Sequence, residues 1–354
     1  MIDQTAVRIA VVADTSLQRH ILQQFLSKHG YQVVLNSDPQ QLAVDRLHAC
    51  ETDLWLYDAI CASETECIAL EYFLSEPSAP VLFGEGAAPA RDSEEFPRWE
   101  RALLKKILQL TESVSAQPLA TDQFSDELDR AQPQVIALPQ HFVKERIASD
   151  QPAQQVWLLA ASLGGPQAVK AFLDVLPQGL PLGFIYAQHI DANFEGSLPQ
   201  AVGRHSQWPV RLLTDYHFVR AGEVVVVPIE RVLTFTESSR LHTLDSAWEG
   251  PYSPSIEQMM RNLAQHYGAH CGVIVFSGMG SDGSLAAEYM HQQGAQVWTQ
   301  NAESCACSSM PDSVRELGLS RFSATPQGLA HELVQYLLNA HKQQHNDDLK
   351  RIRQ

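Results

Sequence analysis

Short apolar runs alternate with helix-like segments along most of this chain, and this alternation limits the folds open to it. The apolar runs cover residues 8–13, 31–35, 54–57, 80–83, 156–160, 183–187, 224–227, 272–276 and 295–298. The helix-like segments cover residues 17–29, 97–110, 166–175, 255–266, 284–292, 310–317 and 328–338. Strands that alternate with helices favour a parallel sheet with crossover helices. We therefore predict an α/β protein.

A polar segment separates two such stretches, so we predict two domains. The first domain spans residues 6–112 and the second spans residues 153–342. Residues 113–152 are rich in Gln, Ser, Asp, Ala and Pro, a composition typical of a linker. We expect a short helix within 135–146. Residues 343–354 are predicted to form a polar tail.

The chain is acidic, with a formal net charge of −16 over 354 residues. Binding of nucleic acid requires clustered Lys and Arg, so this charge argues against a nucleic-acid partner. We find no secretory signal, and the apolar run at 224–229 is far too short to span a bilayer. We expect a cytoplasmic protein that is not an integral membrane protein.

The cysteines are irregularly spaced, which is typical of reduced thiols, and they stand at Cys50, Cys61, Cys67, Cys271, Cys305 and Cys307. The Cys305 and Cys307 pair has no second Cys or His pair at zinc spacing. We therefore predict no metal site there.

Three chemically complementary residues follow three apolar runs of the second domain. Ser162 comes just after the run at 156–160, His189 just after the next, and Asp282 in the glycine-rich loop after the run at 272–276. Ligand sites of open parallel sheets gather beyond the carboxyl ends of the strands. A serine hydroxyl needs a base, and an aspartate can orient a histidine that acts as one. This pattern favours serine-dependent hydrolysis.

Ser162 has a simpler interpretation as well, because a serine before two glycines is often only a helix cap. The glycines at 164 and 165 also suit a sharp turn that exposes a nucleophile and lets substrate approach the backbone. Free amides at the following helix N-terminus could then stabilise an oxyanion.

The loop Gly278–Gly283 admits a second alternative, because it matches the G-x-G-x-x-G fingerprint of dinucleotide-binding proteins. Glu303 lies about twenty residues further on, as that fingerprint requires. Two features oppose this interpretation. The fingerprint normally opens its domain, and Asp282 would repel a pyrophosphate.

The second domain resembles the catalytic domain of the CheB-type chemotaxis protein-glutamate methylesterases. The matching motifs, in order, are Ala161–Gly165, Gln188-His189, the Pro254-Ser255 helix start, Gly278–Gly283, and Asn301–Cys305 with Met310-Pro311. The resemblance implies a doubly wound, mostly parallel sheet with a Ser/His/Asp site at the carboxyl ends of its strands.

The same resemblance implies roles for individual residues. Ser162 would be the nucleophile, His189 the base and Asp282 the orienting carboxylate. The Met279 amide would lie near the oxyanion, together with the loop residues Leu163 and Gly164. Family members hydrolyse γ-glutamyl methyl esters on the cytoplasmic helices of chemoreceptors, and some deamidate glutamines; the chemistry requires no cofactor.

This chain departs from the family pattern at three places near these motifs. Leu163 replaces a threonine, Ile229 replaces a glycine, and Ser253 replaces an arginine. The substitutions remove a hydroxyl and a cation near the serine and the helix start. They bear on substrate preference more than on the three reactive groups.

The first domain resembles a response-regulator receiver, which implies a flavodoxin-like fold. Asp58, after the third apolar run, matches the phosphoacceptor, and Asp14 matches one of two acids that hold Mg²⁺. However, Ala13 stands in place of the second acid, and Gly84 in place of a Ser or Thr.

The end of the first domain also departs from a receiver. No Lys-Pro pair follows a fifth apolar run, and the fourth helix and fifth strand look shortened or lost. We hypothesise that this domain is degenerate and acts by docking, without Mg²⁺-dependent phosphorylation.

These resemblances leave three functions to separate. The leading prediction is a methylesterase that acts on a methylated chemoreceptor in a signalling pathway with a chemotaxis histidine kinase. A deamidase could use the same serine on receptor glutamines. The alternative from another class is a catalytically idle adaptor that binds receptor or kinase.

Overall fold

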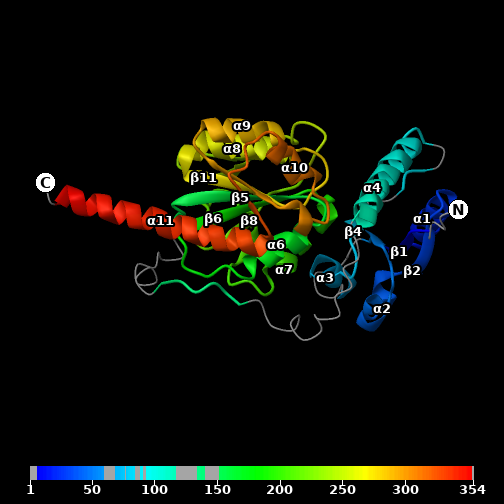
Figure 1. Cartoon of the computed structure of the whole chain (residues 1–354). Coiled ribbons are helices and arrows are strands. Elements are labelled where there is room, and N and C mark those ends of the chain that lie inside the picture. Colours follow the sequence, from blue (N-terminus) through cyan, green and yellow to red (C-terminus); the bar gives the residue numbers. More distant parts are fainter. Residues whose placement is uncertain are drawn as a thin grey trace. The chain divides into compact units, whose positions relative to one another are not determined.

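A computed structural model of the chain describes residues 6–59, 68–75, 77–83, 88–90, 93–116, 134–139 and 151–352. The chain divides into two compact units (Figure 1). Unit 1 is Met1–Asp126 with Ile190–Ser197, and unit 2 is Glu127–His189 with Leu198–Gln354. Gly84 and part of the predicted helix at 135–146 lie outside the described residues.

Unit 1 contains a parallel sheet of strand order β2-β1-β3-β4. Its strands are β1 (Arg8–Ala13), β2 (Gln32–Ser37), β3 (Leu54–Asp58) and β4 (Val81–Phe83). Its helices are α1 (Ser16–Lys28), η1 (Pro39–Gln41), α2 (Val44–His48), α3 (Ile68–Ser75) and α4 (Phe96–Ala116). Flavodoxin-like sheets have the order 2-1-3-4-5. The described residues supply the first four strands of that order and no fifth.

Unit 2 is built on a seven-stranded sheet in which every neighbouring pair is parallel. The order is β13-β12-β11-β5-β6-β8-β7. The strands are β5 (Gln155–Ala161), β6 (Leu182–Gln188), β7 (Val210–Leu212), β8 (Val224–Val226), β11 (Cys271–Val275), β12 (Gln296–Gln300) and β13 (Phe322–Ala324). This sheet confirms the predicted α/β class.

The strand order places a switch point between β5 and β11. After β5 the chain adds β6, then the edge strand β7, then β8 between these two, and it later returns to β11 on the other side of β5. Crevices outside the carboxyl ends of the strands at such a point are the usual ligand sites of open α/β sheets. The ends of β5 and β11 are therefore where a site is expected from topology alone.

Helices cover both faces of this sheet (Figure 1). The helices of unit 2 are α6 (Gly165–Leu173), α7 (Leu198–Gly203), α8 (Ile256–Tyr267), η3 (Gly268–His270), α9 (Ser284–Gln292), η4 (Ala302–Ser304), α10 (Ser309–Glu316) and α11 (Pro326–Ile352), whereas η2 (Ala192–Ser197) is part of unit 1. A separate antiparallel pair joins β9 (Leu233–Phe235) and β10 (Leu241–Thr243).

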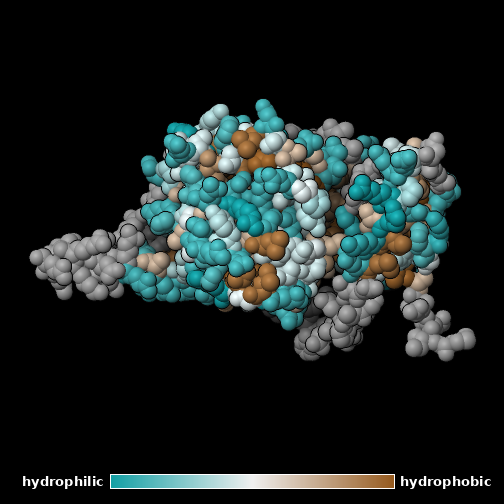
Figure 2. Space-filling model, turned by 90° about the horizontal axis from the view of Figure 1, so that it is seen from above, coloured by the Kyte–Doolittle hydropathy of each residue, from teal (hydrophilic) through white to brown (hydrophobic). Residues whose placement is uncertain are grey.

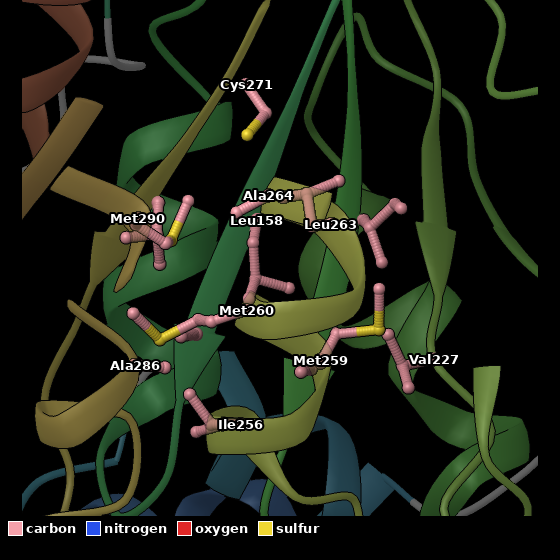
Figure 3. Close-up of a cluster of buried hydrophobic side chains, with 14 of the residues drawn as sticks. Leu158, Val227, Ile256, Met259, Met260, Leu263, Ala264, Cys271, Ala286 and Met290 are labelled. Atoms are coloured by element: carbon pink, nitrogen blue, oxygen red, sulfur yellow. The ribbon is translucent and has the colours of Figure 1, made fainter. Parts of the chain in front are cut away.

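Alternate side chains of β5 pack into two cores. Val156, Leu158 and Ala160 join a buried cluster with the apolar stripe of α8, which contains Ile256, Met259, Met260, Leu263 and Ala264 (Figure 3). That stripe follows the helical spacing of three and four residues. Trp157 points to the opposite face, where its ring contacts the rings of Trp298 on β12 and Tyr336 on α11. Both faces of β5 are thus buried in apolar cores, so a reactive site can form only at an end of this strand.

The structure extends or changes several predicted elements. The backbone over 134–139 is not helical, contrary to the start of the helix predicted at 135–146. α11 continues through Ile352, beyond the predicted domain end at 342, since no Gly or Pro interrupts that segment. α4 likewise runs through Ala116, into the segment predicted as linker.

The visible surface is largely hydrophilic, with apolar side chains in separate patches (Figure 2). None of the helices in the described part of the chain is long and apolar enough to cross a membrane.

Candidate functional site

The ends of three neighbouring strands bring Ser162, His189 and Asp282 to one edge of the unit 2 sheet. Ala161 on β5 is in register with Gln188 on β6, so Ser162 and His189 stand at the next matching positions. The ladder continues across this point, because His189 N donates to Ala161 O at 3.0 Å. Adjacent strands lie roughly 4.8 Å apart. The serine and histidine backbones are therefore neighbours.

The His189 imidazole is paired with the Asp282 carboxylate. His189 Nε2 lies 2.9 Å from Asp282 Oδ2, and the two side chains are 12% and 3% exposed. An imidazole whose Nε2–H donates to a carboxylate presents Nδ1 as its acceptor. Within the described residues no hydrogen bond joins Ser162 Oγ to this ring. Such contacts are commonly loose without substrate.

The N-terminus of α8 holds Asp282 in place. Ile256 N donates to Oδ2 at 2.8 Å, and Glu257 N donates to Oδ1 at 2.9 Å. The first amides of a helix have no partner within the helix, and the dipole favours a negative charge there. Ser255 completes the helix start by accepting a hydrogen bond from Gln258 N. α8 therefore fixes the carboxylate that faces the histidine.

Tyr252 is a residue of this site that sequence reasoning missed. Its ring stacks on the His189 imidazole, with centroids 5.0 Å apart and planes 5° apart. A Cβ added at Gly280 would lie 3.0 Å from the Tyr252 hydroxyl oxygen. Tyr252 thus covers one face of the histidine and reaches the loop after β11.

The two glycines after the serine are required by packing. Gly164 has a φ of +71°, and a Cβ there would lie 2.5 Å from Ala306 Cβ. A Cβ at Gly165 would lie 2.5 Å from Gln188 Oε1. Sequence reasoning assigned the glycines to substrate approach. The structure shows that the chain itself fills the space beside them.

Three backbone amides near the serine have no acceptor among the described residues, namely those of Leu163, Gly164 and Met279. Gln188 Nε2 donates to Ser162 O at 2.7 Å, which fixes the peptide group that carries the Leu163 N–H. Such amides can stabilise a negative oxygen. The arrangement offers a nucleophile, a base with an orienting acid, and candidate oxyanion donors.

The dinucleotide interpretation of Gly278–Gly283 does not fit the structure. Asp282 is committed to His189 and to α8. The N-terminus of α9, where a pyrophosphate would bind, already receives a carboxylate, because Ala286 N donates to Glu257 Oε2 at 2.9 Å. A second anion there would be repelled.

Cys305 and Cys307 are buried in unit 2. The Cys305 thiol donates to Asn301 O, and burial raises its pKa to about 12. A metal ligand must be a thiolate, which this environment opposes. Among the described residues, no group of three His, Cys, Asp or Glu side chains is arranged to hold a metal ion.

In unit 1, a side-chain amide occupies an oxygen of the Asp58 carboxylate, and a guanidinium binds the backbone beside it. Gln18 Nε2 donates to Asp58 Oδ2, while Gln18 Oε1 accepts a hydrogen bond from Ala88 N at 3.0 Å. The Arg19 guanidinium donates to Ala13 O and Asp14 O. Ala13 stands in register with Asp58, so an apolar side chain replaces the second acid. Mg²⁺ prefers oxygen ligands, and this donor set does not fit it.

Unit 2 therefore defines a class of protein: a parallel α/β sheet with a serine, a histidine and an aspartate at its carboxyl edge. The CheB methylesterase family matches residues 157–333, which is 177 of the 354 residues. The chain belongs to this family. The matched segment lies wholly outside residues 6–112.

Curated relatives are similar over the same extent. A protein-glutamate methylesterase/protein-glutamine glutaminase of Anaeromyxobacter dehalogenans is 32% identical over 189 residues, covering 53% of this chain and 55% of the relative. One of Saccharophagus degradans is 33% identical over 163 residues, covering 46% and 45%. The chain spans about half the length of the curated relatives it matches. The Thermotoga maritima CheB methylesterase catalytic domain is 21% identical with a TM-score of 0.49, covering 52% of this chain and 99% of that domain.

Proposed function

We propose that this chain hydrolyses glutamate methyl esters on a chemoreceptor and releases methanol. The main support for this proposal is the 2.9 Å hydrogen bond between His189 Nε2 and Asp282 Oδ2, at the strand end beside Ser162. The names of the curated relatives supply the substrate class. The substrate lies on cytoplasmic receptor helices, so we place the reaction in the cytoplasm, in a pathway with a chemotaxis histidine kinase.

The reaction follows from the groups at hand. Ser162 Oγ attacks the ester carbonyl while His189 Nδ1 takes its proton, and Asp282 stabilises the resulting imidazolium. The carbonyl oxygen becomes an oxyanion, for which the amides of Leu163, Gly164 and Met279 are the candidate donors. His189 then protonates the departing methoxide. Water, activated by the same histidine, cleaves the glutamyl-serine ester and restores both groups. No cofactor takes part in these steps.

Ser162→Ala tests this proposal with methylated receptor as substrate and methanol as the measured product. Loss of a triad nucleophile costs on the order of 10⁶-fold in kcat. Asp282→Asn should reduce kcat by about 10⁴-fold, because the histidine loses its orienting charge. Unchanged methanol release by Ser162→Ala would disprove the mechanism.

Labelling by a fluorophosphonate separates an enzyme from an idle adaptor. An activated Ser162 reacts with the probe, and Ser162→Ala does not. A wild-type protein that stays unlabelled but still binds receptor would favour the adaptor. Deamidation by the same serine would appear as conversion of receptor Gln to Glu, measured by mass spectrometry.

Unit 1 supports a second proposal: this unit acts without Mg²⁺-dependent phosphorylation. Gln18 donates to the Asp58 carboxylate, and Ala13 stands where the second metal-holding acid is expected. Incubation with a small phosphodonor and Mg²⁺ should give no incorporation. Incorporation that disappears in Asp58→Ala would refute this proposal. Gln18→Ala removes the Gln18 amide donor from Asp58. If this donor blocks the metal, phosphoryl incorporation should appear in that variant.

A further inference from the structure

Ser277, the second residue after β11, is buried and contacts every residue of the turn that carries the serine. Its exposed fraction is 1%. Ser162 N donates to Ser277 O at 3.0 Å, and Ser277 Oγ donates to Leu163 O at 2.7 Å. A Cβ added at Gly164 would lie 2.9 Å from Ser277 Oγ. The residue therefore bonds to two residues of the turn and packs against the third.

The bond to Leu163 O orients the Gly164 amide. The carbonyl of one residue and the N–H of the next belong to the same planar trans peptide, so they point in opposite directions. Holding Leu163 O toward Ser277 therefore turns the Gly164 N–H away from Ser277. That N–H has no acceptor among the described residues.

The hydroxyl of Ser277 is itself fixed on its other side. Cys307 N donates to Ser277 Oγ at 3.1 Å, and the hydroxyl has two acceptors in reach, Leu163 O at 2.7 Å and Cys307 O at 3.2 Å, of which Leu163 O is the nearer. Ser277 N donates to the side chain of Gln300 at 2.8 Å. The serine thus joins the turn after β5 to the segment after β12. Alanine at this position would leave Leu163 O without its donor.

The other two candidate amides are oriented in the same way, by a hydrogen bond to the carbonyl oxygen of their own peptide group. Gln188 Nε2 holds Ser162 O, which fixes the Leu163 N–H. Met310 N donates to Gly278 O at 3.0 Å, which fixes the Met279 N–H. Ser277 differs from these, because its bond to Leu163 O is made by one side-chain hydroxyl, which a substitution can remove. Of the three orienting hydrogen bonds, the one from Ser277 can therefore be removed with the smallest change in side-chain shape.

We propose that Ser277 is a positioning residue that orients the Gly164 amide for the oxyanion of the reaction. This inference rests on the proposed function and adds a residue to it. Because Ser277 acts on a donor that is used only when charge develops on the substrate oxygen, it should affect kcat and not substrate binding.

The test compares Ser277→Ala, Ser277→Thr and Thr243→Val in the full chain. Removal of one oxyanion donor costs about 10²–10³-fold in kcat, so a misdirected donor should cost about 10- to 100-fold. We expect this loss in Ser277→Ala with KM unchanged. Ser277→Thr keeps the hydroxyl and should recover most of kcat. Thr243→Val removes another buried hydroxyl of unit 2, bonded to Asp215, and should leave kcat unchanged.

Inhibition by phenylboronic acid supplies a readout that a purely structural role would not move. The boron accepts Ser162 Oγ and becomes a tetrahedral anion, so its affinity depends on the oxyanion donors. The Ki of Ser277→Ala should rise by the factor by which kcat falls. A wild-type kcat and Ki in Ser277→Ala, or an equal loss in Thr243→Val, would overturn the inference. If Ser162→Ala retains wild-type activity, the proposed function fails instead.

Discussion

Gly164 holds the turn after the serine in a left-handed conformation and packs against its neighbours. Gly222 has a similar φ of +84°, but a Cβ there meets nothing within 4 Å. Alanine at Gly222 should therefore cost only the backbone strain, about 1–2 kcal/mol. Alanine at Gly164 adds overpacking against Ala306, about 1–3 kcal/mol more. Urea unfolding of the two variants measures the difference, and equal losses would contradict the packing argument.

Tyr252 should support catalysis through its ring. A cation on an aromatic face gains about 0.5–1 kcal/mol at an exposed site, which corresponds to roughly a 2- to 5-fold change in rate. Tyr252→Leu should therefore lower kcat by about that factor, because the imidazolium loses its aromatic partner. Tyr252→Phe keeps the ring and should retain kcat. Methanol release measures both, and a larger loss in Tyr252→Phe would assign the effect to the hydroxyl.

The sequence was sufficient to predict that Ser162, His189 and Asp282 lie at one edge of the sheet, because each follows a buried apolar run of one parallel sheet. It was not sufficient to find Tyr252 or the role of Ser277. Tyr252 lies in an irregular loop with no period, and its stacking on His189 depends on tertiary packing. Ser277 was read as part of a glycine-rich loop, and only its contacts distinguish it.

At the scale of elements, the first turn of α8 holds the Asp282 carboxylate in place. Ser255 caps the helix whose next two amides hold Asp282. Ser255→Ala should destabilise unit 2 by about 1 kcal/mol, the usual cost of a lost N-cap. It should also lower kcat, since the amides that fix Asp282 lie in the first turn of that helix. Urea unfolding and methanol release measure the two effects.

Ser255→Thr is the matched control, because threonine retains a capping hydroxyl. It should keep most of the stability and of kcat. If Ser255→Ala unfolds more easily while kcat stays at the wild-type value, the first turn does not depend on its cap to hold Asp282.

Most longer elements could be predicted from their apolar pattern, as could the three-residue strands β4 and β8, but four other short strands could not. β5, β6 and β11 were expected within one or two residues of their observed ends, because each is a continuous apolar run buried on both faces. β7, β9, β10 and β13 have three residues each, too few to show alternation. Pairing with neighbouring strands, which no local pattern reveals, defines these four.

At the scale of the molecule, the two units carry different amounts of recognisable chemistry. Unit 2 has the family match and the serine, histidine and aspartate that are predicted to react. Unit 1 has a parallel sheet and Asp58 at the end of β3, but Gln18 and Ala13 alter that aspartate's surroundings. Receiver-like strand order is therefore combined here with side chains around Asp58 that do not fit Mg²⁺.

Buried thiols and a buried phenol should make unit 2 sensitive to alkaline pH. Burial raises the pKa of Cys271 and Cys305 from 9.0, and of Tyr267 from 10.0, to about 12. An unfolded chain releases these protons near the ordinary values. Above about pH 9 the unfolded state therefore binds fewer protons than the folded state, and the free energy of unfolding falls as pH rises. The full stabilisation is present below pH 9 and is lost progressively toward pH 12.

Urea unfolding between pH 8 and pH 11, followed by tryptophan fluorescence, measures this loss. One group that is ionised only in the unfolded state contributes a slope of about 1.4 kcal/mol per pH unit. Cys271→Ala and Tyr267→Phe each remove one such group, so each should show a shallower decline than the wild type, whatever its stability at pH 8. Tyr267→Phe keeps the ring that packs against Phe235. A wild-type slope in both variants would show that other groups cause the alkaline loss.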